Sequence, residues 1–290
     1  MKLGQLTAGL DILERQADLE MEITGVSFDS RRTKPGEVFV AIRGFETDGH
    51  KYIPQAVQAG AACVVCEEKP DVDVPYLIVQ NSRRALAILS AEWFGHPARE
   101  LKIIGVTGTN GKTTTTNLIK MILEECTGEK VGLIGTNVNV IGDVEEEASR
   151  TSPESYDLQQ LLRRMADAGC KWAVMEVSSH ALVLDRVYGI QYEVGVFTNL
   201  TQDHLDFHGT MEAYLEAKSL LFNQSNKGVI NLDDPHAAYL IEHARCPVMT
   251  FSEEDVTADI VAKRIRLHPH KVEFCVLTIG LLIDVEVGIP

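Results

Sequence analysis

The chain has 290 residues, of which 45% are hydrophobic and 24% charged, so disorder is excluded as its main state. Its formal net charge of -15 argues against general affinity for DNA or RNA, because binding to phosphate backbones depends on clustered Lys and Arg. No apolar stretch approaches the roughly 20 residues needed to cross a bilayer, so we expect a cytoplasmic protein without membrane insertion.

The N-terminal third predicts a small α/β domain. Strands are predicted at the apolar runs EVFVAI, AACVVC and PYLIV, and helices at YIPQAVQAG and SRRALAILSAEWF. The segment Gly95-His96-Pro97-Ala98 breaks the second helix, because proline removes a donor and disfavours helix at the preceding residue. We therefore place a domain boundary there, giving domains at residues 1–98 and 99–290.

The six cysteines show neither a disulfide framework nor a zinc-binding pattern. The only close pair, Cys63 and Cys66, lies in the apolar run AACVVCEE. We interpret them as buried strand thiols, in preference to a redox or metal site.

From residue 99 onward, strand and helix signals alternate, which predicts a parallel sheet with helices on both faces. The segments are LKIIGVT, TTTTNLIKMILEEC, KWAVMEV, YEVGVFTNL, MEAYLEAKSLLF, KGVINL and PHAAYLIEHA. After Val248, the pieces VMTF, DIVAKRIRL, KVEFCVLTIG and LLIDVEVGI suggest an antiparallel edge. The fold class is therefore α/β.

The segment GVTGTNGKTTTT, residues 105–116, predicts a phosphate-binding loop between a strand and a helix. Lys112 would reach the β and γ phosphates of ATP, and the Thr113 hydroxyl would hold magnesium. In the following helix we expect an apolar face made of Leu118, Ile119, Ile122 and Leu123.

The loop is a variant, because Val106 stands where the strict P-loop pattern has its first glycine, and an extra glycine occurs at Gly108. A ligand-free, glycine-rich turn is the alternative, but the Gly111-Lys112-Thr113 core between strand and helix favours phosphate binding. The expected ATP contacts are Gly108, Thr109, Asn110, Gly111, Lys112, Thr113 and Thr114.

Polar residues follow the later strands, where open parallel sheets bind their ligands. They are Glu176, Ser178, Ser179 and His180; Thr198, Asn199, Asp203, His204 and Asp206; and Asn231, Asp233 and Asp234. Glu176 offers magnesium a hard oxygen, although a lone glutamate at a strand end is more often solvated. A histidine such as His204 is by itself a poor magnesium ligand.

Taken together, these motifs resemble the Mur ligases in order and spacing. The resemblance rests on TGTNGKTTT, MEVSSHAL, FTNLTQDHLDFHGTMEAYLEAKSLLF and INLDD, which cover most of residues 105–235. The N-terminal segment VSFDSRRTKPGEVFVAIRGFETDGHKYIPQAVQAGA is similar to the UDP-binding domain of the MurE type. A ligase of the folylpolyglutamate type would lack this domain, so the cell-wall branch is favoured.

The resemblance implies a binding site for a UDP-sugar peptide. Its UDP would contact Ser30, Phe28 and the loop residues Phe45, Glu46 and Thr47, and its muramoyl peptide would contact Thr151, Ser152, Ser178 and Arg186. From the residues alone, Ser30 could equally cap a turn and Arg186 could form a surface salt bridge, although a guanidinium suits carboxylate or phosphate. Some relatives have Gln where this chain has Leu184, and that contact is not carried over.

For Lys218, local sequence predicts only a solvated helical lysine with Tyr214 one turn earlier. The resemblance implies that carbon dioxide carbamylates it, producing an anion that helps to hold a second magnesium. The metal candidates for two Mg2+ ions are then Thr113, Glu176, His204 and carbamylated Lys218. Asn231 is a further nucleotide contact, and Asn199 and His180 would orient neighbours.

The implied activity is ATP-dependent ligation through an acyl phosphate, in which UDP-MurNAc-L-Ala-D-Glu gains meso-diaminopimelate or L-lysine in peptidoglycan precursor synthesis. No Asp-Asn-Pro-Arg motif of the family's third domain follows residue 235. We therefore expect that the amino-acid-binding domain is absent and that the chain alone binds substrate without ligating. The alternatives are a nucleotide- and substrate-binding module without turnover and a folylpolyglutamate-synthase-like ligase.

Overall fold

The computed structural model describes residues 1–44 and 47–288 and forms two compact units, neither of which is continuous in sequence. Unit 1 comprises Met1–Lys102, Gly128–Ala173 and His180–Ile190, and unit 2 comprises Ile103–Thr127, Val174–Ser179 and Gln191–Pro290. Phe45 and Glu46, which the sequence predicts to contact UDP, lie outside the described residues.

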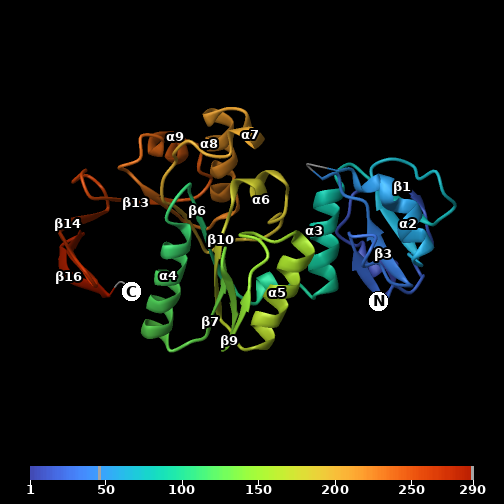
Figure 1. Ribbon diagram of the computed structural model, residues 1–290, viewed down its shortest axis with the longest axis horizontal. Helices are drawn as coiled ribbons and strands as arrows, with labels where there is room; N and C mark the ends of the chain where they lie inside the picture. The colour runs from blue at the N-terminus through green and yellow to red at the C-terminus, as the bar shows by residue number, and fades with distance from the viewer. Residues whose placement is uncertain (45–46, 289–290) are drawn as a thin grey trace. The chain divides into compact units, whose positions relative to one another are not determined.

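Unit 1 contains a five-stranded sheet in the order β1-β5-β4-β3-β2 (Figure 1). Strands β2 to β5 are parallel, and β1 pairs antiparallel with β5. The elements are α1 (Leu3–Leu6), β1 (Ile12–Gln16), β2 (Gly25–Ser27), β3 (Glu37–Val40), a 3-10 turn (Gly49–Tyr52), α2 (Ile53–Gln58), β4 (Cys63–Cys66), β5 (Tyr76–Val79), α3 (Ser82–Trp93) and a second 3-10 turn (Pro97–Arg99). The predicted strands and helices are confirmed.

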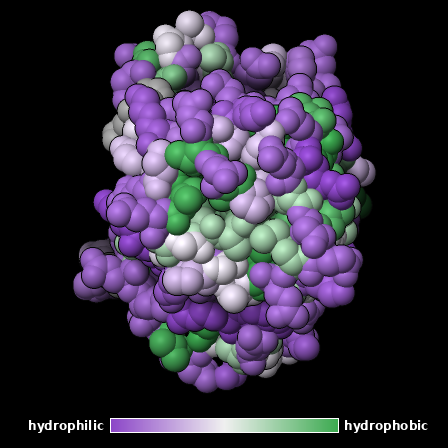
Figure 2. Space-filling view, turned by 90° about the vertical axis from the view of Figure 1, so that its right-hand side faces the viewer, coloured by the Kyte–Doolittle hydropathy of each residue, from purple (hydrophilic) through white to green (hydrophobic). Residues whose placement is uncertain are grey.

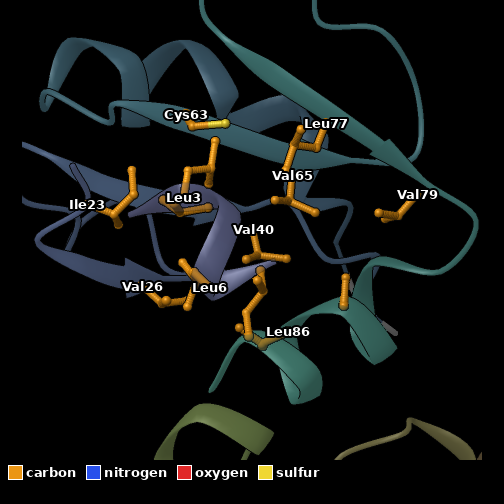
Figure 3. Packing of buried hydrophobic residues seen from close by; sticks show 13 residues of the cluster. Leu3, Leu6, Ile23, Val26, Val40, Cys63, Val65, Leu77, Val79 and Leu86 are labelled. Carbon is orange, nitrogen blue, oxygen red and sulfur yellow. The ribbon is translucent and has the colours of Figure 1, made fainter. Parts of the chain in front are cut away.

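Both faces of this sheet are buried, which explains why its strands read as continuous apolar runs. Val40, Cys63 and Leu77 pack with α1 and α3 on one face (Figure 3). Phe39, Val64 and Cys66 pack with Ile53 and Ala56 of α2 on the other.

The cysteine pair is divided between these two faces. Cys63 and Cys66 are free and fully buried, and burial raises the pKa of each thiol to about 12. The prediction of buried strand thiols is confirmed, because side chains on opposite faces of a sheet cannot chelate a metal together.

The rest of unit 1 consists of an antiparallel β7-β8-β9 ribbon and helix α5, which lies beside α3 (Figure 1). The bounds are β7 (Val131–Ile134), β8 (Val138–Ile141), β9 (Val144–Glu147) and α5 (Ser155–Asp167). Leu158, Leu161, Leu162 and Met165 form the buried stripe of α5 at helical spacing. Two elements begin in one unit and end in the other: β10 (Trp172–Glu176) and α6 (Ser179–Val183).

Unit 2 is built on a mainly parallel sheet, as predicted. Its strands follow the order β16-β15-β14-β13-β12-β11-β6-β10, with parallel pairing from β14 to β6. The elements are β6 (Lys102–Thr107), α4 (Lys112–Thr127), β11 (Val194–Phe197), α7 (Leu205–His208), α8 (Met211–Ser219), a 3-10 turn (Leu220–Gln224), β12 (Gly228–Asn231), α9 (Ala237–His243), β13 (Val248–Ser252), β14 (Ile260–His268), β15 (Lys271–Thr278) and β16 (Leu281–Gly288).

Two details differ from the sequence prediction. The antiparallel edge consists of β14 to β16 only, because α9 carries the chain back across the sheet and β13 therefore pairs parallel with β12. In α4, Ile122 is 59% exposed and does not belong to the predicted apolar face. Leu118, Ile119 and Leu123 of that face are half-buried, and Thr116 is fully buried.

The surface of the N-terminal elements is mostly hydrophilic, with apolar residues in small groups (Figure 2). Small apolar groups of this kind are ordinary on a folded protein. Within the described residues, no helix combines the length and apolar character needed to span a bilayer.

Candidate nucleotide and substrate sites

The glycine-rich loop lies between the end of β6 at Thr107 and the start of α4 at Lys112, as the sequence predicts (Figure 1). Gly108 has φ +149°, and a Cβ on it would lie 1.9 Å from the hydroxyl oxygen of Thr198. Val106 is fully buried inside β6. The departure from the strict motif is thereby explained, because the close backbone approach that requires a glycine occurs at residue 108.

Residues after β11 hold this loop. The Asn199 carbonyl accepts a hydrogen bond from Thr109 N (2.8 Å), and its Oδ1 accepts one from Asn110 N (2.9 Å). The Thr198 hydroxyl donates to the Asn110 carbonyl at 2.7 Å. Asn199 therefore orients its neighbours, as predicted. Asn231, the predicted nucleotide contact, donates from Nδ2 to the Thr198 carbonyl at 2.9 Å. It therefore binds the Thr198–Asn199 segment that holds the loop.

The Lys112 side chain folds back onto the loop that precedes it. Its Nζ donates to the carbonyls of Gly108 and Thr109, each at 2.9 Å. Burial lowers the pKa of this ammonium, and the nearby carboxylates of Glu176 and Asp203 act in the opposite direction. The loop thus carries a cation close to its backbone, which is the arrangement required for phosphate binding.

Glu176 is only 1% exposed at the end of β10 and accepts a hydrogen bond from the Thr113 hydroxyl at 3.0 Å. The alternative of a solvated strand-end carboxylate is therefore wrong. Thr113 and Glu176 together offer hard oxygen donors that suit Mg2+, which normally keeps waters and phosphate oxygens as its other ligands. Within residues 1–44 and 47–288, no three His, Cys, Asp or Glu side chains are grouped to hold a metal ion.

Lys218 is 1% exposed, so the prediction of a solvated helical lysine is wrong. Its Nζ lies 4.4 Å from the centroid of the Tyr214 ring, and no hydrogen-bond or ion-pair partner occurs in the described part of the chain. Burial and the charge of Lys112 lower the pKa of Lys218 to about 7, against the opposing effect of Asp203. A substantial fraction of this amine is therefore neutral near pH 7.

Tyr214 has a central position that was not predicted from the sequence. Its hydroxyl lies 3.3 Å from Thr109 Oγ1, and its ring stacks on His208, with centroids 4.8 Å apart. His204 contacts the same ring edge-on at 6.2 Å, and its Nε2 is 3.4 Å from Asp203 Oδ2. The signal for it in the sequence was its place one helical turn before Lys218.

In unit 1, the predicted UDP contacts are built around a turn. The Ser30 hydroxyl donates to Gln55 Oε1 at 2.9 Å, and the backbone N–H of Arg31 is capped by Asp29 instead. Ser30 is therefore not the turn's cap. The Phe28 ring lies 6.2 Å from that of Tyr156, and the Thr47 hydroxyl lies 3.4 Å from Tyr52 Oη.

Hydrogen bonds connect some of the predicted peptide contacts of unit 1 to one another or to their neighbours. Arg186 Nη1 donates to the Ser152 carbonyl at 3.3 Å, and Thr151 Oγ1 accepts from the Thr136 hydroxyl at 3.1 Å. Arg186 is mostly buried and pairs with Glu154, so the alternative of a surface salt bridge is wrong. Of the remaining predicted residues, Ser178 follows β10, and His180 lies in α6.

The fold and the loop define an α/β protein of the P-loop type. Comparison with known families matches residues 22–98 to "Mur ligase family, catalytic domain" and residues 106–290 to "Mur ligase middle domain". The chain belongs to the Mur ligase family.

Individual relatives agree with this assignment. The UDP-N-acetylmuramoyl-L-alanyl-D-glutamate--2,6-diaminopimelate ligases of Clostridium perfringens and Clostridium tetani are 46% and 44% identical, in each case over 100% of this chain. A solved structure of a ligase with that name matches 98% of the chain, with a TM-score of 0.84 and 28% identity. The chain spans about 60% of the length of these relatives.

Proposed function

We propose that this chain serves an ATP-dependent ligase that adds 2,6-diaminopimelate to UDP-MurNAc-L-Ala-D-Glu in peptidoglycan precursor synthesis. Residues 1–98 would bind the UDP-sugar, and residues 99–290 would bind ATP. The observation that carries the proposal is the loop in which Lys112 lies beside Thr113, itself bonded to the buried Glu176. The names of relatives 43–46% identical to this chain support the choice of substrate and amino acid.

In this reaction the γ-phosphate of ATP passes to the D-glutamyl carboxylate, and the amine of the amino acid then displaces phosphate. Protein catalysis of phosphoryl transfer consists mostly of positioning and charge stabilisation. Lys112 and the loop N–H groups would hold the phosphates, and Thr113 with Glu176 would hold Mg2+. The metal would neutralise charge that develops on the transferred group. Asn199 would keep the loop in its binding shape.

Lys218 would hold a second magnesium after carbamylation, with His204 as a further ligand. Only a neutral amine attacks carbon dioxide, so a pKa near 7 makes Lys218 reactive where ordinary lysines remain protonated. We expect a carbamate signal in carbon NMR with isotopically labelled bicarbonate above pH 7. The signal should fade as the pH drops below 7 and be absent in Lys218→Ala. The same signal in both proteins would leave Lys218 without this role.

Solved folylpolyglutamate synthases also share the fold, including that of Mycobacterium tuberculosis, with a TM-score of 0.56. At 15% identity over 69% of this chain, the likeness concerns the fold alone. The two alternatives tested against the proposal are a folate-type ligase and a binding module without turnover.

The decisive experiment incubates the protein with ATP, Mg2+ and UDP-MurNAc-L-Ala-D-Glu, with diaminopimelate, lysine or no amino acid. Free phosphate and tripeptide product are measured separately. We expect phosphate release that requires both Mg2+ and the dipeptide substrate, and any tripeptide formed should contain diaminopimelate. Substrate binding without phosphate release would indicate a binding module, and release stimulated by a folate instead would contradict the proposal.

A further inference from the structure

A carboxylate, Glu154, lies among three arginines of unit 1. Its Oε1 is 2.8 Å from Arg186 Nε and 3.3 Å from Arg150 Nη1, and its Oε2 is 3.3 Å from Arg83 Nη1. Glu154 is 8% exposed, and the side chains of Arg83 and Arg186 are also mostly buried. The Arg186 contact is an ion pair rather than a straight hydrogen bond, because the Nε hydrogen is not directed at the oxygen.

The position of Glu154 in its helix does not explain this orientation. Glu154 is the N-cap residue of α5, where a side chain normally accepts a hydrogen bond from the first turn. Its carboxylate makes no such bond and turns to the guanidinium groups instead. The contacts with arginine therefore determine where this side chain lies.

One of these arginines, Arg83, and its neighbours Asn81 and Arg84 hold the turn that precedes Arg186. Arg83 Nη1 also donates to the Leu184 carbonyl at 3.3 Å. Asp185, with φ +52°, accepts from Asn81 Nδ2 at 3.0 Å and from Arg84 Nε at 3.2 Å. A non-glycine residue in this conformation persists only where its surroundings hold it. The turn is thus held by the start of α3.

The Arg186 guanidinium contacts both Glu154 and the Ser152 carbonyl, so Glu154 holds the same group that binds the Thr151–Ser152 segment. Three guanidinium charges against one carboxylate leave the cluster with a surplus of two positive charges. The cluster therefore remains suited to an anionic ligand after Glu154 has been counted.

We propose that Glu154 is a positioning residue that holds Arg186 by Nε and directs its terminal nitrogens toward a carboxylate or phosphate of the substrate. This inference rests on the proposed function, in which Arg186 contacts the anionic peptide of UDP-MurNAc-L-Ala-D-Glu. Glu154 itself would not touch the substrate.

Glu154→Gln separates positioning from electrostatics, because the two predict opposite signs. Removing a negative charge makes the cluster more cationic, so electrostatics alone would tighten the binding of an anion. Loss of positioning would weaken it. We expect the Kd for UDP-MurNAc-L-Ala-D-Glu, measured by calorimetry on the whole chain, to rise about tenfold. The stabilisation by ATP and Mg2+ should be unchanged, and the far-UV circular dichroism of the variant should match that of the wild-type protein, which would show that the variant is folded.

The matched control is Glu146→Gln, which removes a half-buried partner of Arg164 at 2.7 Å and should leave the Kd unchanged. Glu154→Asp keeps the charge on a shorter side chain and should recover part of the affinity. Unchanged or tighter binding by Glu154→Gln would overturn the inference.

A second measurement needs no ligand. In nitrogen relaxation NMR, the Arg186 Nε of the wild-type protein should report a rigid guanidinium group, and this group should become more mobile in Glu154→Gln, because the ion pair at 2.8 Å is lost. An Arg186 signal that the substitution does not alter would also overturn the inference. If the wild-type protein fails to bind the dipeptide substrate, the proposed function fails, and this signal still decides the role of Glu154.

Discussion

Lys112→Ala is expected to remove most of the thermal stabilisation that ATP with Mg2+ gives to this protein. The Lys112 ammonium lies 2.9 Å from two carbonyls of the loop that is expected to bind the phosphates. A ligand at 100 times its Kd stabilises the folded state by about 2.7 kcal/mol, so the wild-type protein should show a clear rise in Tm. We expect the variant to show little or none.

The control for this experiment is Lys120→Ala in the same helix. Lys120 pairs with Glu124 at 2.7 Å, further along α4, and takes no part in the loop. Its removal should leave the ATP-dependent rise in Tm intact. A rise in Lys112→Ala as large as in wild type would refute the phosphate-binding role of Lys112.

Gly108→Ala should disrupt the same loop by a different route. Its Cβ would lie 1.9 Å from Thr198 Oγ1, and its φ of +149° is unfavourable for any L side chain. Either β11 or the loop must move, so we expect loss of ATP-dependent stabilisation together with roughly 2 to 4 kcal/mol of folding stability. Denaturant unfolding with and without ATP measures both effects.

Two further variants separate the clash from the backbone strain. Gly280 also has positive φ, +73°, but a Cβ on it would meet no atom of the described chain within 4 Å beyond its immediate neighbours. Gly280→Ala should therefore cost only about 1 kcal/mol. Thr198→Ala removes the oxygen that the new methyl group at position 108 would strike, so it should restore part of the stability in the double variant. Equal costs for Gly108→Ala and Gly280→Ala would contradict the explanation by steric clash.

The sequence predicts the fold well because its signals are local. Alternation of strands and helices indicated the parallel sheet, and glycines next to Lys112 and Thr113 marked the loop at the right strand end. The errors arose where tertiary packing decides. Ile122 has the right spacing for a buried face, but the folded chain leaves it 59% exposed.

The environment of the site residues depends on contacts far apart in sequence, which no local pattern contains. In α8 both Leu215 and Lys218 are buried, so helical periodicity does not distinguish the lysine from its apolar neighbours. Glu154 reads as an ordinary residue at a helix start, and only folding brings Arg83 and Arg186 to it. The resemblance to a family supplied a role for Lys218 and none for Glu154.

The exposure of the cysteines also determines where the protein can be labelled through a thiol. Cys63, Cys66, Cys170 and Cys275 are buried, Cys246 is half-buried, and Cys126 is exposed. Cys126 lies in the last turn of α4, the helix whose first residue is Lys112. A fluorescent label on the native Cys126 side chain would therefore report on the nucleotide-binding helix from the end opposite to the phosphates, without any engineered cysteine.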